Sequence, residues 1–207
     1  VLYRKQARFQ LITTGKISQK SLLFEDQHLE RLTKASRYFA YPFDPEELRQ
    51  KIEEECQACD SHQDYRLRIS LSKSGEMELS RQVLTPLSPT FCKAKLCLQE
   101  ADLNQAFTYF KTTHRPHLSL GKQEIIYHNA AGELLETSIG NLVLKIDGKL
   151  YTPPINLGIL SGIYRQHLLG KGQVEEKILT LADLNQAEAV YGCNAVRGLY
   201  ELELREK

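Results

Sequence analysis

Apolar and polar residues alternate along several short stretches of the chain, which predicts β-strands. In residues 65–72 apolar side chains take every second position, with Arg66 and Arg68 between them. A period of two is typical of a strand with one buried face, and the Ser74-Gly75 pair is typical of the turn that ends it. We therefore interpret Arg66 and Arg68 as the polar face of a strand.

Two stretches of the first half repeat their apolar residues every three or four positions, as helices do. We expect one helix to be capped by Asp26 and to reach Phe39, and a second to cover residues 44–59, opened by Asp44 and Pro45. Ahead of them, two short strands are predicted around a turn at Thr14-Gly15. These two strands cover residues 8–12 and 16–24.

The second half of the chain contains many short strand patterns. Asp147-Gly148 between two of them is the strongest hairpin signal in the sequence. Gly162 is expected to open a helix and Asp183 to cap a short one. The expected strands are 107–111, 124–128, 133–137, 141–146, 149–152, 174–180, 188–192 and 197–204.

These patterns predict an α+β protein with two lobes. The first, residues 1–104, contains the helices, and the second, residues 105–207, is rich in strands. Residues 85–89, with two prolines, read as a connector, because proline cannot donate to a central strand. We expect the two lobes to join near residues 104–111.

Composition narrows the possible functions. The chain has 207 residues, with 27 Lys and Arg against 26 Asp and Glu, a net charge of +1. This balance gives no general attraction for nucleic acid or membrane lipid, and no apolar run reaches the roughly 18 residues that a membrane helix needs. Five cysteines favour a reducing compartment, so we expect a cytoplasmic protein. Cys56 and Cys59 lie on the apolar face of a predicted helix and are interpreted as buried residues rather than metal ligands; no metal site is predicted.

Four features of the second half could act together. Lys111 follows Phe107, Tyr109 and Phe110, an apolar setting that would lower its pKa and leave a neutral amine able to attack a carbonyl. Glu136 ends a predicted strand. Residues 158–165 form a loop entering a helix, where unpaired backbone N–H groups favour a phosphate. Residues 191–195 read as a small-residue turn able to offer more N–H donors.

An amine that captures an aldehyde, a carboxylate and an anion cradle are the groups that pyridoxal 5'-phosphate (PLP) requires. The residue order strengthens this reading. Lys111-Thr-Thr-His-Arg115, then Glu136-Thr-Ser-Ile-Gly-Asn141, then Gly158-Ile-Leu-Ser-Gly-Ile-Tyr-Arg165 resembles the fold-type IV PLP enzymes, also called class IV aminotransferases. In the first half, His28-Leu-Glu-Arg31-Leu32 is similar to a family segment. The Lys-Thr-Thr-x-Arg form and Cys193-Asn194-Ala195 look most like the 4-amino-4-deoxychorismate lyases of this family.

The resemblance implies the two-lobe fold of D-amino-acid aminotransferase, a homodimer and a role for each matched residue. Lys111 would bind the cofactor covalently and move the proton, and Glu136 would pair with the pyridine nitrogen. Arg31 would reach the phosphate, so the site is expected between the lobes. The other residues implied to contact the cofactor are Arg115, Leu160, Ile163, Tyr164, Cys193 and Asn194.

Three functions stay open at this point. The first is a lyase that converts aminodeoxychorismate into 4-aminobenzoate and pyruvate; the second is an aminotransferase for a small amino acid. The third is a PLP-binding protein without catalysis. Gln10 and Tyr164 stand where the family usually has Glu and Thr, and His114 replaces a common Asn. These departures leave the identity of the small-molecule amino substrate more open than the identity of the cofactor.

Overall fold

The computed structural model describes residues 9–99, 106–119 and 121–204, and its chain divides into two compact units. Unit 1 consists of Val1–Thr85 with Phe110–Arg115, and unit 2 of Pro86–Tyr109 with Pro116–Lys207. The division therefore falls near residue 85, whereas we expected it at residue 104. Residue 8 of the first expected strand and residues 104 and 105 of the expected junction between the lobes lie outside the described residues.

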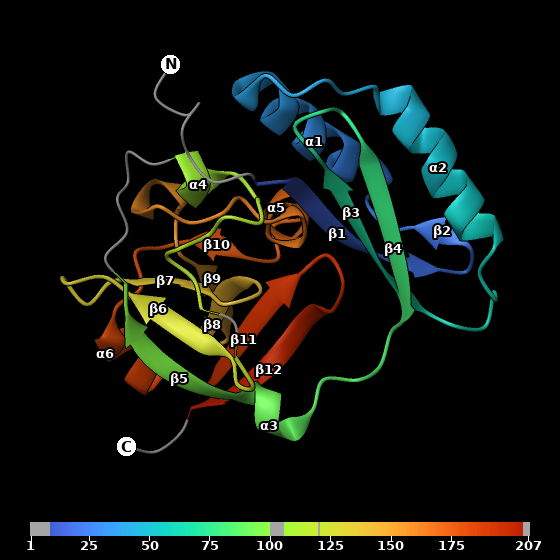
Figure 1. The fold of residues 1–207 in the computed structure, drawn as a ribbon. Helices are drawn as coiled ribbons and strands as arrows, with labels where there is room; N and C mark the ends of the chain where they lie inside the picture. The colour runs from blue at the N-terminus through green and yellow to red at the C-terminus, as the bar shows by residue number, and fades with distance from the viewer. Residues whose placement is uncertain (1–8, 100–105, 120, 205–207) are drawn as a thin grey trace. The chain divides into compact units, whose positions relative to one another are not determined.

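Unit 1 is an antiparallel four-stranded sheet, in the order β2-β1-β3-β4, with two helices beside it (Figure 1). The first helix contacts β1, and the second contacts β2 and β4. In chain order the elements are β1 (Leu11–Ser18), β2 (Ser21–Leu22), α1 (Glu25–Phe39), α2 (Pro45–Gln57), β3 (Tyr65–Leu71) and β4 (Met77–Val83).

Strand β1 runs without interruption through Gly15, so the predicted turn at Thr14-Gly15 is wrong. The chain turns instead at Gln19 and Lys20, whose φ angles of 49° and 60° are left-handed. Gly15 is required by packing rather than by a turn: a Cβ there would lie 2.6 Å from Nε2 of His28 on α1. Local sequence could not reveal this contact, because His28 lies thirteen residues further along the chain.

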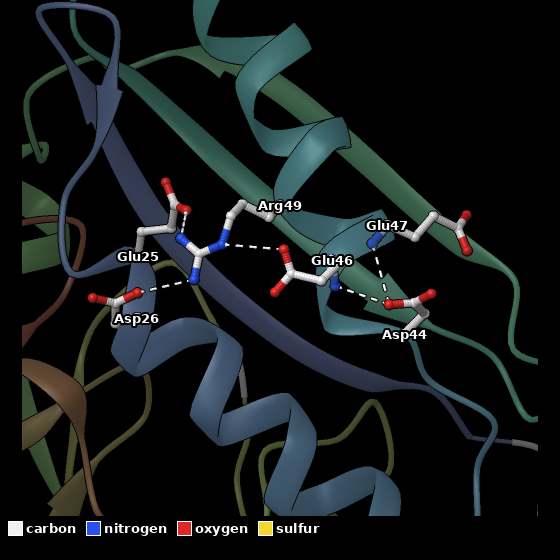
Figure 2. Close-up of polar contacts among 6 residues, drawn as sticks. All are labelled: Glu25, Asp26, Asp44, Glu46, Glu47 and Arg49. Carbon is white, nitrogen blue, oxygen red and sulfur yellow. Dashed lines mark hydrogen bonds and ion pairs between the residues drawn. The ribbon is translucent and has the colours of Figure 1, made fainter.

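The two helices begin differently. Phe24, with a left-handed φ of 60°, precedes α1, and Asp26 lies inside the first turn, so the prediction that Asp26 caps the helix is wrong. Asp44 does cap α2, since its carboxylate accepts hydrogen bonds from two backbone N–H groups of the first turn. Arg49 of α2 then binds Glu25 at 2.6 Å and Asp26 at 3.1 Å, which connects the two helix starts (Figure 2).

Unit 2 is built on an eight-stranded sheet in the order β10-β9-β8-β11-β12-β5-β6-β7. A further pairing of β7 with β8 closes six of these strands into a ring. The elements are α3 (Pro89–Cys92), β5 (Lys93–Leu98), α4 (Ala106–Tyr109), β6 (Ile125–His128), β7 (Leu134–Thr137), β8 (Asn141–Ile146), β9 (Lys149–Thr152), a 3-10 helix (Ile155–Leu157), α5 (Ile163–Gly170), β10 (Glu175–Glu176), α6 (Leu181–Gln186), β11 (Ala189–Asn194) and β12 (Gly198–Leu204).

Most local predictions for unit 2 are confirmed. The β8–β9 hairpin turns at Asp147 and Gly148, whose φ angles of 49° and 74° suit this turn, and Gly162 precedes α5. Apolar side chains from β6, β7, β8, β11 and β12 form the core. Two predictions are wrong: the strand expected over 174–180 shortens to Glu175–Glu176, and α6 is capped by Thr180, with Asp183 as its reciprocal partner.

The segment Phe110–Arg115 returns to unit 1 because it hydrogen-bonds to the start of β1. The N–H of Ile12 donates to the carbonyl of Lys111 at 3.0 Å, and the N–H of Thr113 donates to the carbonyl of Gln10 at 2.9 Å. The strand expected over 107–111 is wrong, because Ala106–Tyr109 forms the short helix α4. A sequence pattern of alternating aromatic residues could not distinguish this single turn of helix from a strand.

Cys56 and Cys59 are buried, as predicted. Over the described ranges, the structure groups no three His, Cys, Asp or Glu side chains in a way that could hold a metal ion. In the same part of the chain, no helix is both long enough and apolar enough to cross a membrane.

Candidate functional site

Lys111 is held in a defined orientation by the backbone pairing with β1. Thr112 is bridged to Leu11, and residues paired in an antiparallel bridge point to the same face. That face lies toward α1, since Phe110 packs on Tyr38 and Phe39 of this helix with ring centroids 4.6 and 5.3 Å apart. Successive side chains alternate, so the Lys111 side chain points to the opposite face of the sheet.

The same face carries arginines of β3. Thr13 points toward α1, where its hydroxyl lies 2.6 Å from Nδ1 of His28, so the next residue, Thr14, points away. Thr14 pairs with Arg68, which places Arg68 on the face of Lys111, and Arg66 lies two residues before it. The alternating pattern of residues 65–72 assigns both arginines to a polar face, but it does not show that Lys111 lies near them.

This environment lowers the pKa of the Lys111 amine well below its usual 10.5. Burial is the largest cause, because it disfavours the ammonium form, and repulsion by neighbouring guanidinium groups follows. Those groups belong to Arg31, Arg115, Arg66 and Arg68. The apolar setting that the sequence predicted is therefore only part of the cause; the charged part comes from residues distant in sequence.

Arg31 of α1, predicted from the His-x-x-Arg segment, is close enough to Lys111 and Arg115 for their charges to interact. Its pKa is lowered to about 10, first by burial and then by Arg115. His28, one turn earlier, is fully buried, and its pKa falls to about 3 because of burial, then Arg31, then Lys111. His28 is therefore neutral, and the cationic cluster of unit 1 consists of Arg31, Arg66, Arg68, Lys111 and Arg115.

Unit 2 contains the other predicted residues. Glu136 lies near the end of β7, is 2% exposed and pairs in register with Asn141 at the start of β8. The Asn141 amide donates from Nδ2 to the carbonyl of Leu160 at 2.8 Å, which ties the hairpin to the loop before α5. Leu160 and Ile163 are both buried.

The start of α5 is a cradle of backbone atoms. Gly162 precedes the helix without a side-chain cap, and the backbone N–H groups at the start of a helix favour an anion. A Cβ at Gly162 would lie 1.9 Å from Oδ1 of Asn141, so only glycine fits there. Tyr164 lies in the first turn, with its ring within 3.4 Å of a Cβ built at Gly198, which brings the turn before β12 to this helix.

Cys193 and Asn194 differ from the prediction of a turn, because both belong to strand β11. The Cys193 thiol is buried, which raises its pKa to about 12. Asn194 Oδ1 accepts hydrogen bonds from the N–H groups of Val196 and Arg197, both at 2.9 Å. Its Nδ2 donates to the carbonyl of Ile139 at 3.4 Å, so the Asn194 amide connects the turn before β12 to the β7–β8 turn.

The structure thus brings the predicted residues together in two sets. Lys111, Arg31 and Arg115 form part of the cationic cluster of unit 1. Glu136, Leu160, Ile163, Tyr164, Cys193 and Asn194 lie in unit 2 around the start of α5 and the adjoining ends of β7, β8 and β11. An amine of low pKa, a buried carboxylate and an anion cradle are the groups that PLP requires.

Comparison with known proteins identifies the class. Residues 10–202 match the model of the amino-transferase class IV family, so the chain belongs to this family. The two-unit α+β fold and the order of Lys111, Glu136 and α5 agree with this assignment.

The relatives include both lyases and aminotransferases. The chain is 26% identical to an aminodeoxychorismate lyase of Saccharomyces cerevisiae, a match covering 69% of this chain and about half, 52%, of the yeast protein. It is 25% identical to a candidate aminodeoxychorismate lyase of Schizosaccharomyces pombe, with 82% and 79% covered. Among solved structures, a candidate amino-acid aminotransferase of Mesorhizobium loti is 28% identical, with a TM-score of 0.82 over 95% of this chain and 100% of that one.

Proposed function

We propose that this protein is a PLP-dependent lyase that converts 4-amino-4-deoxychorismate into 4-aminobenzoate and pyruvate. The observation that carries this proposal is the Lys111 amine, whose pKa is lowered well below 10.5 by burial and by four arginines. A neutral lysine can both capture an aldehyde and accept a proton. The names of the two yeast relatives support the lyase reaction.

The residues present fit PLP. Lys111 supplies the amine, Glu136 a buried carboxylate and the uncapped start of α5 an anion cradle in which Gly162 leaves no room for a Cβ. When bound, PLP supplies an electron sink for the charge left after a C–H bond breaks. Glu136 would pair with its ring nitrogen, while Ile163 and Tyr164 would bind its phosphate through their N–H groups.

The protein residues would then move one proton. Neutral Lys111 would take it from the substrate carbon that bears the amino group, and the ammonium thus formed would return it to the methylene carbon of the departing enolpyruvyl group. The C–O bond to the ring breaks in between, so pyruvate leaves and the ring becomes aromatic. No other reactant is consumed, because 4-aminobenzoate and pyruvate together contain every atom of the substrate.

The cationic cluster favours a substrate with more than one negative charge. Arg66 and Arg68 add two positive charges on the face to which Lys111 points. Aminodeoxychorismate carries two carboxylates, whereas a branched-chain amino acid carries one. Electrostatic complementarity of this kind selects among substrates that share the same reacting group.

An aminotransferase acting on a small amino acid is the second candidate. It is supported by the similarity to the Mesorhizobium loti protein, which extends over 95% of this chain. An aminotransferase needs a 2-oxo acid as acceptor, whereas the lyase reaction needs no second substrate. A PLP-binding protein without catalysis would form the cofactor adduct and release neither product.

The deciding experiment combines a spectrum with a product assay. PLP added to the wild type should produce the visible absorption band of a lysine adduct, and Lys111→Ala should lack it. The wild type should then release equal amounts of 4-aminobenzoate and pyruvate from aminodeoxychorismate without a 2-oxo acid. A band without these products, together with amino transfer to 2-oxoglutarate, would establish the aminotransferase instead; no band in either protein would reject PLP altogether.

We also propose a cytoplasmic homodimer. Leu96 and Leu98 of β5 are 41% and 51% exposed, which supports a partner that covers this strand. Light scattering during gel filtration should give twice the mass of 23.7 kDa. The double variant Leu96→Lys with Leu98→Lys should instead have the monomer mass of 23.7 kDa. A wild type of monomer mass would refute the dimer.

A further inference from the structure

Glu124, directly before β6, is a buried carboxylate that none of the roles above uses. Its side chain is 0% exposed. Ser138 donates a hydrogen bond to its Oε1, and the Tyr200 hydroxyl donates to its Oε2 at 2.9 Å. Burial raises the pKa of Glu124 and also raises the pKa of Tyr200 well above 10, so Tyr200 keeps its proton and remains a donor. We call Glu124, Ser138 and Tyr200 the Glu124 brace.

The brace holds the turn that joins β7 to β8. Ser138 opens this turn, and its N–H donates to the carbonyl of Ile125 at 3.0 Å. The turn is closed by the N–H of Thr137, which donates to the carbonyl of Gly140 at 2.9 Å. Glu136 lies two residues before Ser138, so any shift of the turn displaces the Glu136 carboxylate.

Tyr200 extends the brace to β11. A Cβ built at Gly192 would lie 2.4 to 2.6 Å from atoms of the Tyr200 ring and hydroxyl, and one at Gly140 would lie 3.1 Å from the hydroxyl. The Tyr200 ring therefore packs directly on the backbone of Gly192, and its hydroxyl lies beside Gly140. The residue after Gly192 is Cys193, so the same side chain fixes the turn beside Glu136 and the strand beside the α5 cradle.

We propose that the Glu124 brace is a positioning device that holds Glu136 where it pairs with the ring nitrogen of PLP. This inference rests on the proposed function for the identity of the cofactor, but the brace itself is a property of the chain alone. Glu124 is a positioning residue, not a catalytic one, because it acts through Ser138 and Tyr200. Loss of Glu124 would remove the acceptor that the Ser138 and Tyr200 hydroxyls share, at a cost in stability at this turn.

A double-mutant cycle tests the route through Glu136. The dissociation constant for PLP is titrated by absorbance in wild type, Ser138→Ala, Glu136→Ala and the double variant. We expect Ser138→Ala to weaken binding about tenfold when Glu136 is present and less than about twofold when it is absent. Tyr200→Phe should behave in the same way, whereas Tyr151→Phe, which changes a hydroxyl of β9, should leave binding unchanged. Equal losses in both backgrounds would overturn the proposal, since a general loss of stability does not depend on Glu136.

Hydrogen exchange in the cofactor-free protein separates the brace from the proposed function. The amides of Thr137 and Gly140 should exchange about tenfold faster in Ser138→Ala than in wild type, while amides of the β8–β9 hairpin should not change. If the wild type takes up no PLP, the proposed function fails, and the exchange rates alone decide whether the brace holds the turn. Unchanged exchange at Thr137 and Gly140 would overturn the brace even in a protein that binds PLP.

Discussion

Replacing Gly162 by alanine should disrupt the start of α5. The backbone there is unstrained for alanine, with φ at −71°, so the effect is steric. The new Cβ would lie 1.9 Å from Oδ1 and 3.1 Å from Cγ of Asn141, and the Asn141 side chain must leave. Its hydrogen bond to the buried Leu160 carbonyl is then lost, at about 1–3 kcal/mol, and crowding adds about 1–3 kcal/mol.

The combined loss of about 2–6 kcal/mol corresponds to a melting temperature lower by about 5–20 °C for a chain of this size. Scanning fluorimetry and circular dichroism would measure it. Gly170→Ala is the matched control in the same helix: nothing lies within 4 Å of its Cβ, and alanine there should be neutral or slightly stabilising. In an Asn141→Ala background, Gly162→Ala should cost about 1 kcal/mol or less. Equal melting of Gly162→Ala and Gly170→Ala would refute the reasoning.

Three further changes test other parts of the structure. Lys111→Met should raise the melting temperature at pH 7, because the folded state lowers the pKa of Lys111 and so disfavours its ammonium; thermal scans should show this gain shrinking as the pH rises toward 10.5. His28→Gln should remove a pH dependence: His28 binds its proton more weakly when folded, so wild-type stability relative to the variant should fall by about 1.4 kcal/mol per pH unit from pH 6.5 down to about 3, and identical urea denaturation profiles would contradict this. Thr180→Ala should cost about 1 kcal/mol by loss of the α6 cap, measured by urea denaturation, with a difference under 0.3 kcal/mol counting against it.

Local signals predicted those elements whose ends are defined by their own residues. Asp44 with Pro45 started α2, Asp147-Gly148 turned the β8–β9 hairpin, and Gly162 preceded α5. The failures occurred where a distant contact decided the outcome. Gly15 suggested a turn because glycine is common in turns, whereas its role is to admit the His28 ring against a continuous strand.

The candidate site likewise has features that the sequence order indicates and features that depend on distant contacts. Lys111, Glu136 and the α5 segment could be proposed from their order in the chain, because the family resemblance preserves that order, and their roles stay predictions. The charges that lower the pKa of Lys111 could not, since Arg66 and Arg68 lie more than forty residues away and reach it only through the pairing of β3 with β1. A period of two shows that two side chains share a face, but not what else lies on that face.

Glu124 is a residue whose burial and role the sequence does not indicate. A glutamate before a strand is usually exposed to solvent, and nothing in its neighbours indicates burial. Its partner Ser138 lies in the β7–β8 turn and its partner Tyr200 on β12, and the three meet only because the ring of strands brings β6, this turn and β12 together. A buried carboxylate must be satisfied by hydrogen bonds, so its two hydroxyl partners connect Glu124 to the turn that carries Glu136. If Glu136 pairs with the cofactor as proposed, Glu124 would thereby determine where that carboxylate lies.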